Sequence, residues 1–248
     1  MSRTPSKNKK LGQCFLEDRN ILNLEAKLAK IKGKTVLEIG AGDGRLTQAL
    51  LKQSPEKVYV VEKDSRFADL LREKFKDIEV LEGDFLEINL PKVDVIVGNI
   101  PYYISSDIVF KIKTLDVDSA LLMVQKEFAE KMVAKPGERN YGRLSVTSQL
   151  SFDVKLERIV LRHLFNPSPE VDSAIILLKP TGNKLSQFEE NIIRYIFQHK
   201  NKTVKNALLD SKMFTKEELA FVEKFAKKRG RNLTKEEVLE IAEKLKNL

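Results

Sequence analysis

The sequence predicts an α/β protein in which a Rossmann-like, doubly wound sheet precedes a small all-helical C-terminal domain. Three observations support this fold. Short β-branched runs alternate with amphipathic segments from residue 34 to about residue 180. A glycine-rich stretch directly follows the first of these runs. After Pro180 the strand signals stop, so we divide the chain into domains of residues 1–180 and 181–248.

The β-branched runs have the length of buried strands, and the segments between them have helical periodicity. Strands that alternate with helices at this spacing indicate a parallel sheet covered by helices. The predicted strands are 35–40, 57–62, 78–83, 93–98, 119–124, 154–160 and 172–180. The predicted helices of this domain include 45–53, 65–75 and 105–115.

The predicted C-terminal domain contains three segments with helical periodicity, which are 185–200, 215–230 and 234–248. The second and third begin with a threonine that precedes a glutamate by three residues. This spacing is typical of a capping box, in which the two side chains satisfy free backbone N–H groups at the start of a helix.

The charge of the chain is concentrated at its two ends. The formal net charge is +8, and the first ten residues carry four basic side chains and no acidic one. Residues 181–248 carry 15 Lys and Arg against 10 Asp and Glu. Basic ends on a nearly neutral body suggest a polyanionic partner, although a solvated, lysine-rich surface explains the same composition.

Several classes of protein are disfavoured by composition. Cys14 is the only cysteine, which excludes an internal disulfide and a cysteine-built zinc site and favours a reducing, cytoplasmic location. No apolar run approaches the roughly 18 residues needed to span a bilayer, and the basic N-terminus is not followed by the apolar core of a signal peptide. We expect no membrane association and no metal.

Ligand-compatible groups follow each of the first three predicted strands. The first is the loop "LEIGAGDGRLT", with Gly40, Gly42 and Gly44, where the backbone can turn tightly and approach a ligand closely. Glu62 ends the second strand, where its carboxylate can accept both hydroxyl hydrogens of a ribose, and Asp84 follows the third, where it can accept from an adenine amine. Either acid could instead cap a helix. Together these groups predict an adenosine-bearing ligand.

The spacing of the glycines helps to choose between adenosine-bearing cofactors. The loop is G-x-G-x-G, whereas dinucleotide sites have G-x-G-x-x-G. No histidine or lysine is placed to handle a hydride, which disfavours an NAD oxidoreductase. Neither His163 nor His199 belongs to a catalytic constellation.

The fourth predicted strand ends in Asn99-Ile100-Pro101-Tyr102, which matches the N-P-P-Y-like signature of enzymes that methylate exocyclic amines. The Asn99 amide oxygen and a backbone carbonyl of the turn can accept the two hydrogens of an adenine N6 amine. Pro101 fixes the turn, and Tyr102 offers a face for the base to stack on. The alternative is a rigid turn whose aromatic side chains pack into the core.

Here the chain resembles the small-subunit (16S) ribosomal RNA adenine N6-dimethyltransferases, the family whose loss confers kasugamycin resistance. The resemblance extends over essentially the whole chain. It rests on "KKLGQCFLED", "LEIGAGDGRLT", "VGNIPYYIS", "LMVQKEFAEKM", "YGRLSV", "FNPSPEVDSAI" and "KNKTVKNAL", in that order. It implies a class I methyltransferase that uses S-adenosylmethionine to dimethylate two adjacent adenosines in a 3′-terminal hairpin of the small-subunit RNA.

The resemblance also assigns residues. Asn99 and Tyr102 would be catalytic, with Phe165 covering the second face of the base. Asn99 would also contact the cofactor, together with Cys14, Leu16, Gly40, Gly42, Glu62 and Asp84. The family usually has Asn where this chain has Cys14, in the loop expected to close over the cofactor, so any contact there would be through the backbone or weaker.

The implied partner is the small-subunit RNA or its precursor particle, bound by a monomer. The lysines expected to hold its phosphates are Lys7, Lys9, Lys10, Lys200, Lys202 and Lys205. Two alternatives stay open. One is a large-subunit (23S) RNA adenine methyltransferase of the macrolide-resistance type, which shares the cofactor groups. The other is a ribosome assembly factor on the same fold that has no catalytic activity.

Overall fold

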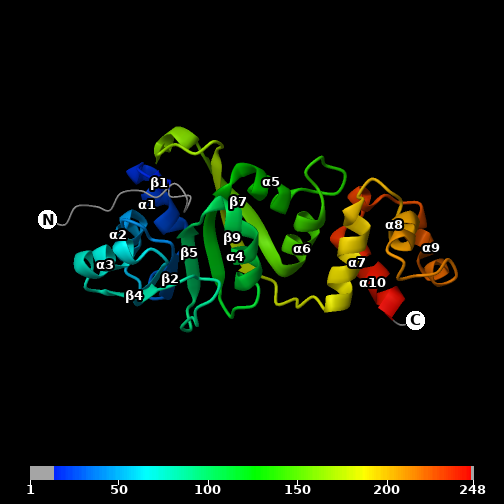
Figure 1. Cartoon of the computed structure of the whole chain (residues 1–248), viewed down its shortest axis with the longest axis horizontal. Coiled ribbons are helices and arrows are strands. Elements are labelled where there is room, and N and C mark those ends of the chain that lie inside the picture. Colours follow the sequence, from blue (N-terminus) through cyan, green and yellow to red (C-terminus); the bar gives the residue numbers. More distant parts are fainter. Residues whose placement is uncertain (1–13, 247–248) are drawn as a thin grey trace. The chain divides into compact units, whose positions relative to one another are not determined.

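The computed structural model describes residues 14–246 (Figure 1). Its contacts divide the chain into two compact units. The first combines the chain up to Ala129 with Lys155–Pro180, and the second combines Glu130–Val154 with the chain from Thr181 onward. This division differs from a single cut after residue 180, because residues 130–154 join the C-terminal helices.

The first unit is built on a seven-stranded sheet, as the sequence predicts. The strand order is β4-β3-β2-β5-β6-β9-β7, with a separate β1-β8 pair. The strands of the large sheet are β2 (Thr35–Ile39), β3 (Lys57–Glu62), β4 (Ile78–Glu82), β5 (Val95–Asn99), β6 (Ser119–Gln125), β7 (Phe152–Val160) and β9 (Ser173–Pro180). The short strands are β1 (Phe15–Leu16) and β8 (Phe165–Asn166). The predicted fold class is confirmed.

The sheet is not parallel throughout. β2 pairs in parallel with β3 and β5, β3 with β4, and β5 with β6, whereas β9 runs antiparallel to β6. The apolar pattern of a fully buried strand is the same in either direction, so the sequence did not indicate this reversal. The parallel part brings the carboxyl ends of β2, β3, β4 and β5 to one edge.

Helices pack on this sheet with local signals that explain where they begin. The Asp18 side chain accepts from the backbone N–H groups of Asn20 and Ile21, and Asp64 accepts from Arg66. Apolar faces of α1 and α2 join a core with Val95 and other residues of the central strands. The helices are α1 (Arg19–Leu28), α2 (Arg45–Leu51), α3 (Ser65–Lys74), α4 (Ser105–Ile112) and α5 (Lys126–Val133), the last of which crosses the boundary between the units.

The second unit consists mainly of helices around a core of its own. Buried side chains of α6, α7, α8 and α10 form one apolar cluster, and the fully buried Tyr141 donates from its hydroxyl to the Leu233 carbonyl at 2.7 Å. These contacts explain why residues 130–154 belong with the tail. The helices are α6 (Arg143–Ser151), α7 (Gln187–Gln198), α8 (Val204–Asp210), α9 (Glu223–Ala226) and α10 (Lys235–Lys246).

Both predicted capping boxes are confirmed. Glu218 and Glu237 accept from the backbone N–H of Thr215 and Thr234 at 2.7 and 3.1 Å, and the threonine hydroxyls accept in return. The predicted helix 215–230 is shorter than expected, however. Its first part is a 3₁₀ segment, Glu218–Val222, which is followed by the single turn of α9.

Candidate functional site

A cavity of about 620 Å³ lies in the first unit at the carboxyl ends of the parallel strands. Nine residues that the sequence singles out for the cofactor and the base line this cavity together. They are Cys14, Leu16, Gly40, Gly42, Glu62, Asp84, Asn99, Tyr102 and Phe165. This edge of the sheet is where open α/β folds bind their ligands.

The glycine loop has a left-handed backbone at its three glycines. The φ angles are +67° at Gly40, +53° at Gly42 and +77° at Gly44. A Cβ atom at Gly40 would meet no atom within 4 Å, whereas one at Gly42 would lie 2.3 Å from a ring carbon of Phe15. Gly40 therefore leaves open space for a ligand beside the backbone, and Phe15 packs directly on Gly42.

Glu62 is held rigidly at the end of β3. One carboxylate oxygen accepts from the Gly42 N–H at 2.9 Å, and the other accepts from the Asp64 N–H at 3.0 Å. Burial raises the pKa of Glu62, and the backbone N–H groups oppose that rise. Each oxygen keeps a further acceptor position, so the carboxylate is oriented without being saturated.

Asp84 has two partners in the structure. Its Oδ1 accepts from the Leu86 N–H at 2.9 Å, and its Oδ2 accepts from Lys63 Nζ at 2.8 Å. The Lys63 ammonium holds the pKa of Asp84 below its usual value. The first contact is a capping-type bond of the kind that the sequence left open as an alternative. As in Glu62, each oxygen keeps a further acceptor position, so an adenine amine would bind beside the Leu86 N–H or beside the exposed Lys63.

The turn after β5 presents Asn99 and Tyr102 to the cavity. The Ile100 N–H donates to the Met123 carbonyl at 3.3 Å, which keeps the turn aligned with β6. Pro101 has φ −59° and ψ 135°, and a 3₁₀ turn, Tyr102–Ile104, follows it. The Tyr102 hydroxyl and Ser173 Oγ are hydrogen-bonded at 2.7 Å, so the partly buried ring is tethered from β9. The neighbouring Tyr103 is 67% exposed.

A buried carboxyl group behind Asn99 was not anticipated from the sequence. The terminal amide atom of Asn99 that faces Glu25 is assigned as the nitrogen, because an amide oxygen there would face only acceptors; so oriented, it donates to Glu25 Oε1 at 2.6 Å and to Oε2 at 3.2 Å. Glu25 is fully buried on α1, and burial together with the charge of Glu38 raises its pKa to about 8. The signal was present in the sequence, because Glu25 occupies the apolar face that Leu22 and Ala26 define at helical spacing.

The wall of the cavity at the β1-β8 pair is formed by Phe165, Leu16 and Cys14. Leu16 pairs with Phe165 in register, and both belong to the apolar core of this unit. Phe165 is only 7% exposed, so most of its ring serves packing. Cys14 is partly buried and packs against the same core.

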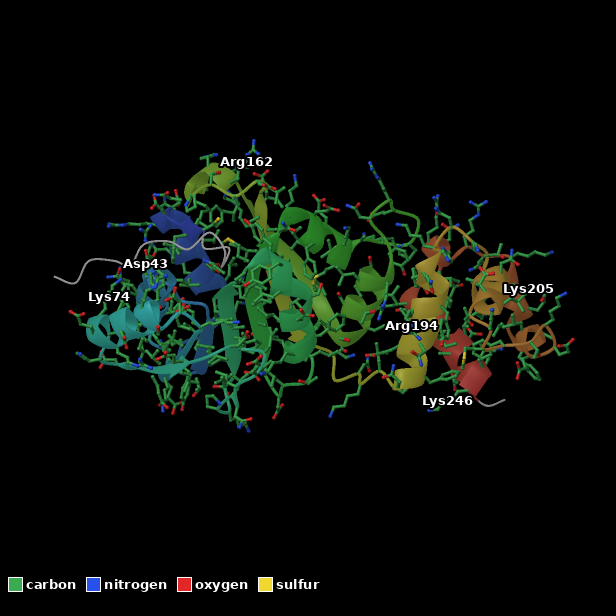
Figure 2. The ribbon with its side chains drawn as sticks, viewed as in Figure 1. Asp43, Lys74, Arg162, Arg194, Lys205 and Lys246 are labelled. Carbon is green, nitrogen blue, oxygen red and sulfur yellow. The ribbon has the colours of Figure 1, made fainter. Side chains whose placement is uncertain are left out.

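The predicted RNA-binding lysines fall into different situations. Lys7, Lys9 and Lys10 lie outside the described residues. Lys200 Nζ donates to the carbonyls of Arg139 and Tyr141, both at 2.8 Å. Lys202 is paired with Asp210 at 2.6 Å, and Lys205, labelled on α8 in Figure 2, has no hydrogen-bond or ion-pair partner within residues 14–246.

Between Cys14 and Lys246, no group of three or more His, Cys, Asp or Glu side chains could hold a metal ion. In the same part of the chain, no helix is both long and apolar enough to cross a membrane.

Comparison with known proteins places the whole chain in one family. The family model for ribosomal RNA adenine dimethylase matches residues 4–247. The chain belongs to this family. The resemblance stated from the seven sequence segments is thereby confirmed.

The names of related proteins agree with this family assignment. A protein of Thermococcus onnurineus named probable ribosomal RNA small subunit methyltransferase A is 40% identical over 252 residues, which cover 96% of this chain and 92% of that protein. A protein of the same name from Thermococcus sibiricus is 42% identical over 208 residues, which cover 82% of this chain and 76% of that protein.

Solved structures of two related enzymes have the same fold. A dimethyladenosine transferase from Plasmodium falciparum matches with a TM-score of 0.82 and 33% identity, covering 93% of this chain and 95% of that one. The 23S rRNA methyltransferase ErmE matches with a TM-score of 0.71 and 30% identity, covering 94% and 99%. The fold is that of a class I methyltransferase, and the family implies S-adenosylmethionine as methyl donor.

Proposed function

We propose that this protein dimethylates N6 of two adjacent adenosines in the 3′-terminal hairpin of small-subunit (16S) ribosomal RNA, as a step in small-subunit biogenesis. One observation carries the proposal: the Asn99–Tyr102 turn opens into the same cavity as the glycine loop and Glu62. Amine-binding and adenosine-binding groups therefore face one space. The names of the relatives support the small-subunit RNA as the substrate.

The residues of the cavity fit S-adenosylmethionine. Gly40 leaves room for a ligand at the loop, and Glu62 offers two oriented acceptors to ribose hydroxyls. Asp84 offers a further acceptor position on each oxygen to an adenine amine. Bound there, the cofactor supplies an electrophilic methyl group on its sulfonium. Cys14 and Leu16 complete the wall of the cavity. After the methyl group is transferred, the cofactor product would be S-adenosylhomocysteine.

The turn after β5 would prepare the target amine. The lone pair of adenine N6 is delocalised into the ring, so the amine is a poor nucleophile until its hydrogens are held in a fixed geometry. The Asn99 amide oxygen would accept one hydrogen, and a backbone carbonyl of the Ile100–Pro101 turn would accept the other. Fixed acceptors of this kind act by positioning, which can contribute several kcal/mol, on the order of 7–11 in favourable systems.

The base would stack on Tyr102, whose orientation the Ser173 hydrogen bond fixes. To reach this ring, each adenosine has to leave its stack in the RNA hairpin. Phe165 is mostly buried, so it offers the second face of the base only the small part of its ring that lines the cavity. Tyr102 is therefore the main stacking surface of the proposal.

Methylation of separated ribosomal subunits tests the substrate. We expect labelled S-adenosylmethionine to modify unmethylated small subunits, and nucleoside analysis to give N6,N6-dimethyladenosine at two adjacent positions. The 30% identity to a 23S rRNA methyltransferase makes the large subunit the necessary comparison. Label confined to the large-subunit RNA would overturn the proposal in favour of that specificity. If neither subunit acquires label, a ribosome assembly factor without catalytic activity would be favoured.

Lysines of the helical unit would hold RNA phosphates, and they differ in the contacts that they make within the protein. Lys205 is available for a phosphate, whereas Lys200 already binds two carbonyls. We expect Lys205→Glu to weaken RNA binding at low salt without changing the unfolding midpoint, because it removes one electrostatic contact. Lys200→Met should cost about 1–3 kcal/mol of unfolding free energy, because it leaves the partly buried Tyr141 carbonyl without this donor.

Binding assays and thermal unfolding of both variants distinguish these effects. Cofactor affinity serves as the control and should stay at the wild-type value in Lys205→Glu. A Lys205→Glu variant that loses RNA affinity and cofactor affinity together would show that the lysine acts on the fold rather than on a phosphate. The proposal further takes the enzyme to be a cytoplasmic monomer that needs no metal.

A further inference from the structure

The carboxyl group of Glu25 occupies a position that an apolar side chain would fill at lower free-energy cost. It is fully buried on α1, among residues of the apolar core. No lysine or arginine in the described part of the chain forms an ion pair with it. A buried carboxyl without a cation is costly unless a hydrogen bond compensates, and here the donor is the Asn99 amide nitrogen.

The orientation of an asparagine amide decides what it can bind. The amide presents an acceptor oxygen on one side and a donor nitrogen on the other. An adenine amine needs an acceptor, so a nitrogen facing the cavity would oppose the N6 hydrogens. Turning the Asn99 side chain over would therefore change a productive site into a repulsive one.

We propose that Glu25 is a positioning residue for methyl transfer, which binds the Asn99 amide nitrogen and thereby keeps the amide oxygen directed at the target amine. The inference rests on the proposed function. Its geometric basis is the close approach of the Asn99 amide to Glu25, 2.6 Å to Oε1 and 3.2 Å to Oε2 from the terminal atom that the hydrogen-bonding pattern assigns as the nitrogen. With the nitrogen held from behind, the oxygen is the amide atom left for a ligand in the cavity that Asn99 lines.

Burial and charge support this assignment. The hydrogen bond from Asn99 favours the carboxylate of Glu25, while burial and the nearby Glu38 favour the neutral acid. The ionised carboxylate can accept from the amide nitrogen through either oxygen, and the neutral acid can do so through the oxygen that carries no proton. An apolar residue of similar size would keep the packing of α1 and remove only this acceptor.

Two substitutions at Glu25 distinguish a role in positioning Asn99 from a role in packing. Glu25→Gln keeps an acceptor oxygen, and Glu25→Leu removes it while filling the same space. We expect Glu25→Leu to lower the single-turnover rate of methyl transfer about 100-fold, the loss that misplacement of a reacting group by about 1 Å produces. Its cofactor dissociation constant should match the wild type, and its thermal midpoint should be equal or higher. Glu25→Gln should stay close to the wild-type rate.

A spectroscopic measurement on the cofactor-free protein tests the amide directly. The side-chain ¹⁵NH₂ signal of Asn99, assigned with Asn99→Ala, should shift and lose exchange protection in Glu25→Leu but not in Glu25→Gln. Asn23→Leu, on the exposed face of the same helix, is the matched control and should change neither signal nor rate.

The outcomes distinguish this inference from the proposed function. An unchanged Asn99 signal and rate in Glu25→Leu would overturn the positioning role. So would a loss of rate accompanied by equal losses of stability and cofactor affinity, because that pattern indicates a role in folding. If the wild type methylates neither subunit, the proposed function fails, and the ¹⁵N signal still decides whether Glu25 orients Asn99.

Discussion

Replacing Asn99 with alanine is expected to abolish methyl transfer while cofactor binding stays measurable. The substitution removes the acceptor that holds the target amine, and loss of one such preorganised group costs on the order of 10²–10³-fold in rate. Glu62 and the glycine loop, the main groups expected to hold the cofactor, are not altered. Single-turnover transfer to small subunits and calorimetric titration with the cofactor measure the two quantities separately.

The partnership with Glu25 adds a further expectation for Asn99. Because both residues act through one amide, their effects should not add. The double variant Asn99→Ala with Glu25→Leu should transfer methyl groups no more slowly than Asn99→Ala alone. A rate for Asn99→Ala equal to that of the wild type would contradict the catalytic role of the amide. A double variant much slower than Asn99→Ala would show that Glu25 acts by another route.

The positions of the ligand-binding groups could be predicted because they follow from strand ends. In a parallel sheet the carboxyl ends of neighbouring strands meet at one edge, so the distant residues Gly40, Glu62 and Asn99 had to converge. The direction of β9 could not be predicted in this way. Its mostly buried, apolar pattern fits a parallel or an antiparallel neighbour equally well.

The contacts of side chains whose partners are distant in sequence were harder to predict. Glu25 stands out in the sequence as an acid on the apolar face of a helix, but its partner Asn99, 74 positions further along the chain, is known only from the structure. Lys200 is a predicted phosphate ligand in the sequence, and in the structure two carbonyls of the segment before α6 accept two of the three hydrogens of its ammonium group. Residue type sets what a group can bind, and only the tertiary structure shows which partner it has.

Two buried carboxyl groups should make the stability of the first unit depend on pH. Burial raises the pKa of Glu38 to about 8, and the pKa of Glu25 also rises to about 8. Between the ordinary value of 4.5 and about 8, the folded protein holds protons that the unfolded chain releases. The unfolding free energy therefore falls as pH rises through this range, by at most about 5 kcal/mol per carboxyl.

Glu38→Gln should remove much of this dependence. The Gln oxygen can still accept from Thr47 Oγ1, which donates to Glu38 at 2.6 Å, and no charge has to be buried. Losing Glu38 also lessens the repulsion that raises the pKa of Glu25. We expect the cofactor-free variant to match the wild type near pH 5 and to exceed its unfolding free energy by about 2–5 kcal/mol at pH 8.

Urea unfolding followed by circular dichroism at both pH values measures this difference. The carboxyl groups with lowered pKa, which are Asp84, Asp210 and Glu237, titrate below the range and should not obscure it. Glu56→Gln, an exposed substitution, is the control and should change the unfolding free energy little at either pH. If Glu38→Gln gave the same gain at pH 5 as at pH 8, the gain would come from packing. The two carboxyl groups would then carry their charge in the folded protein already at pH 5.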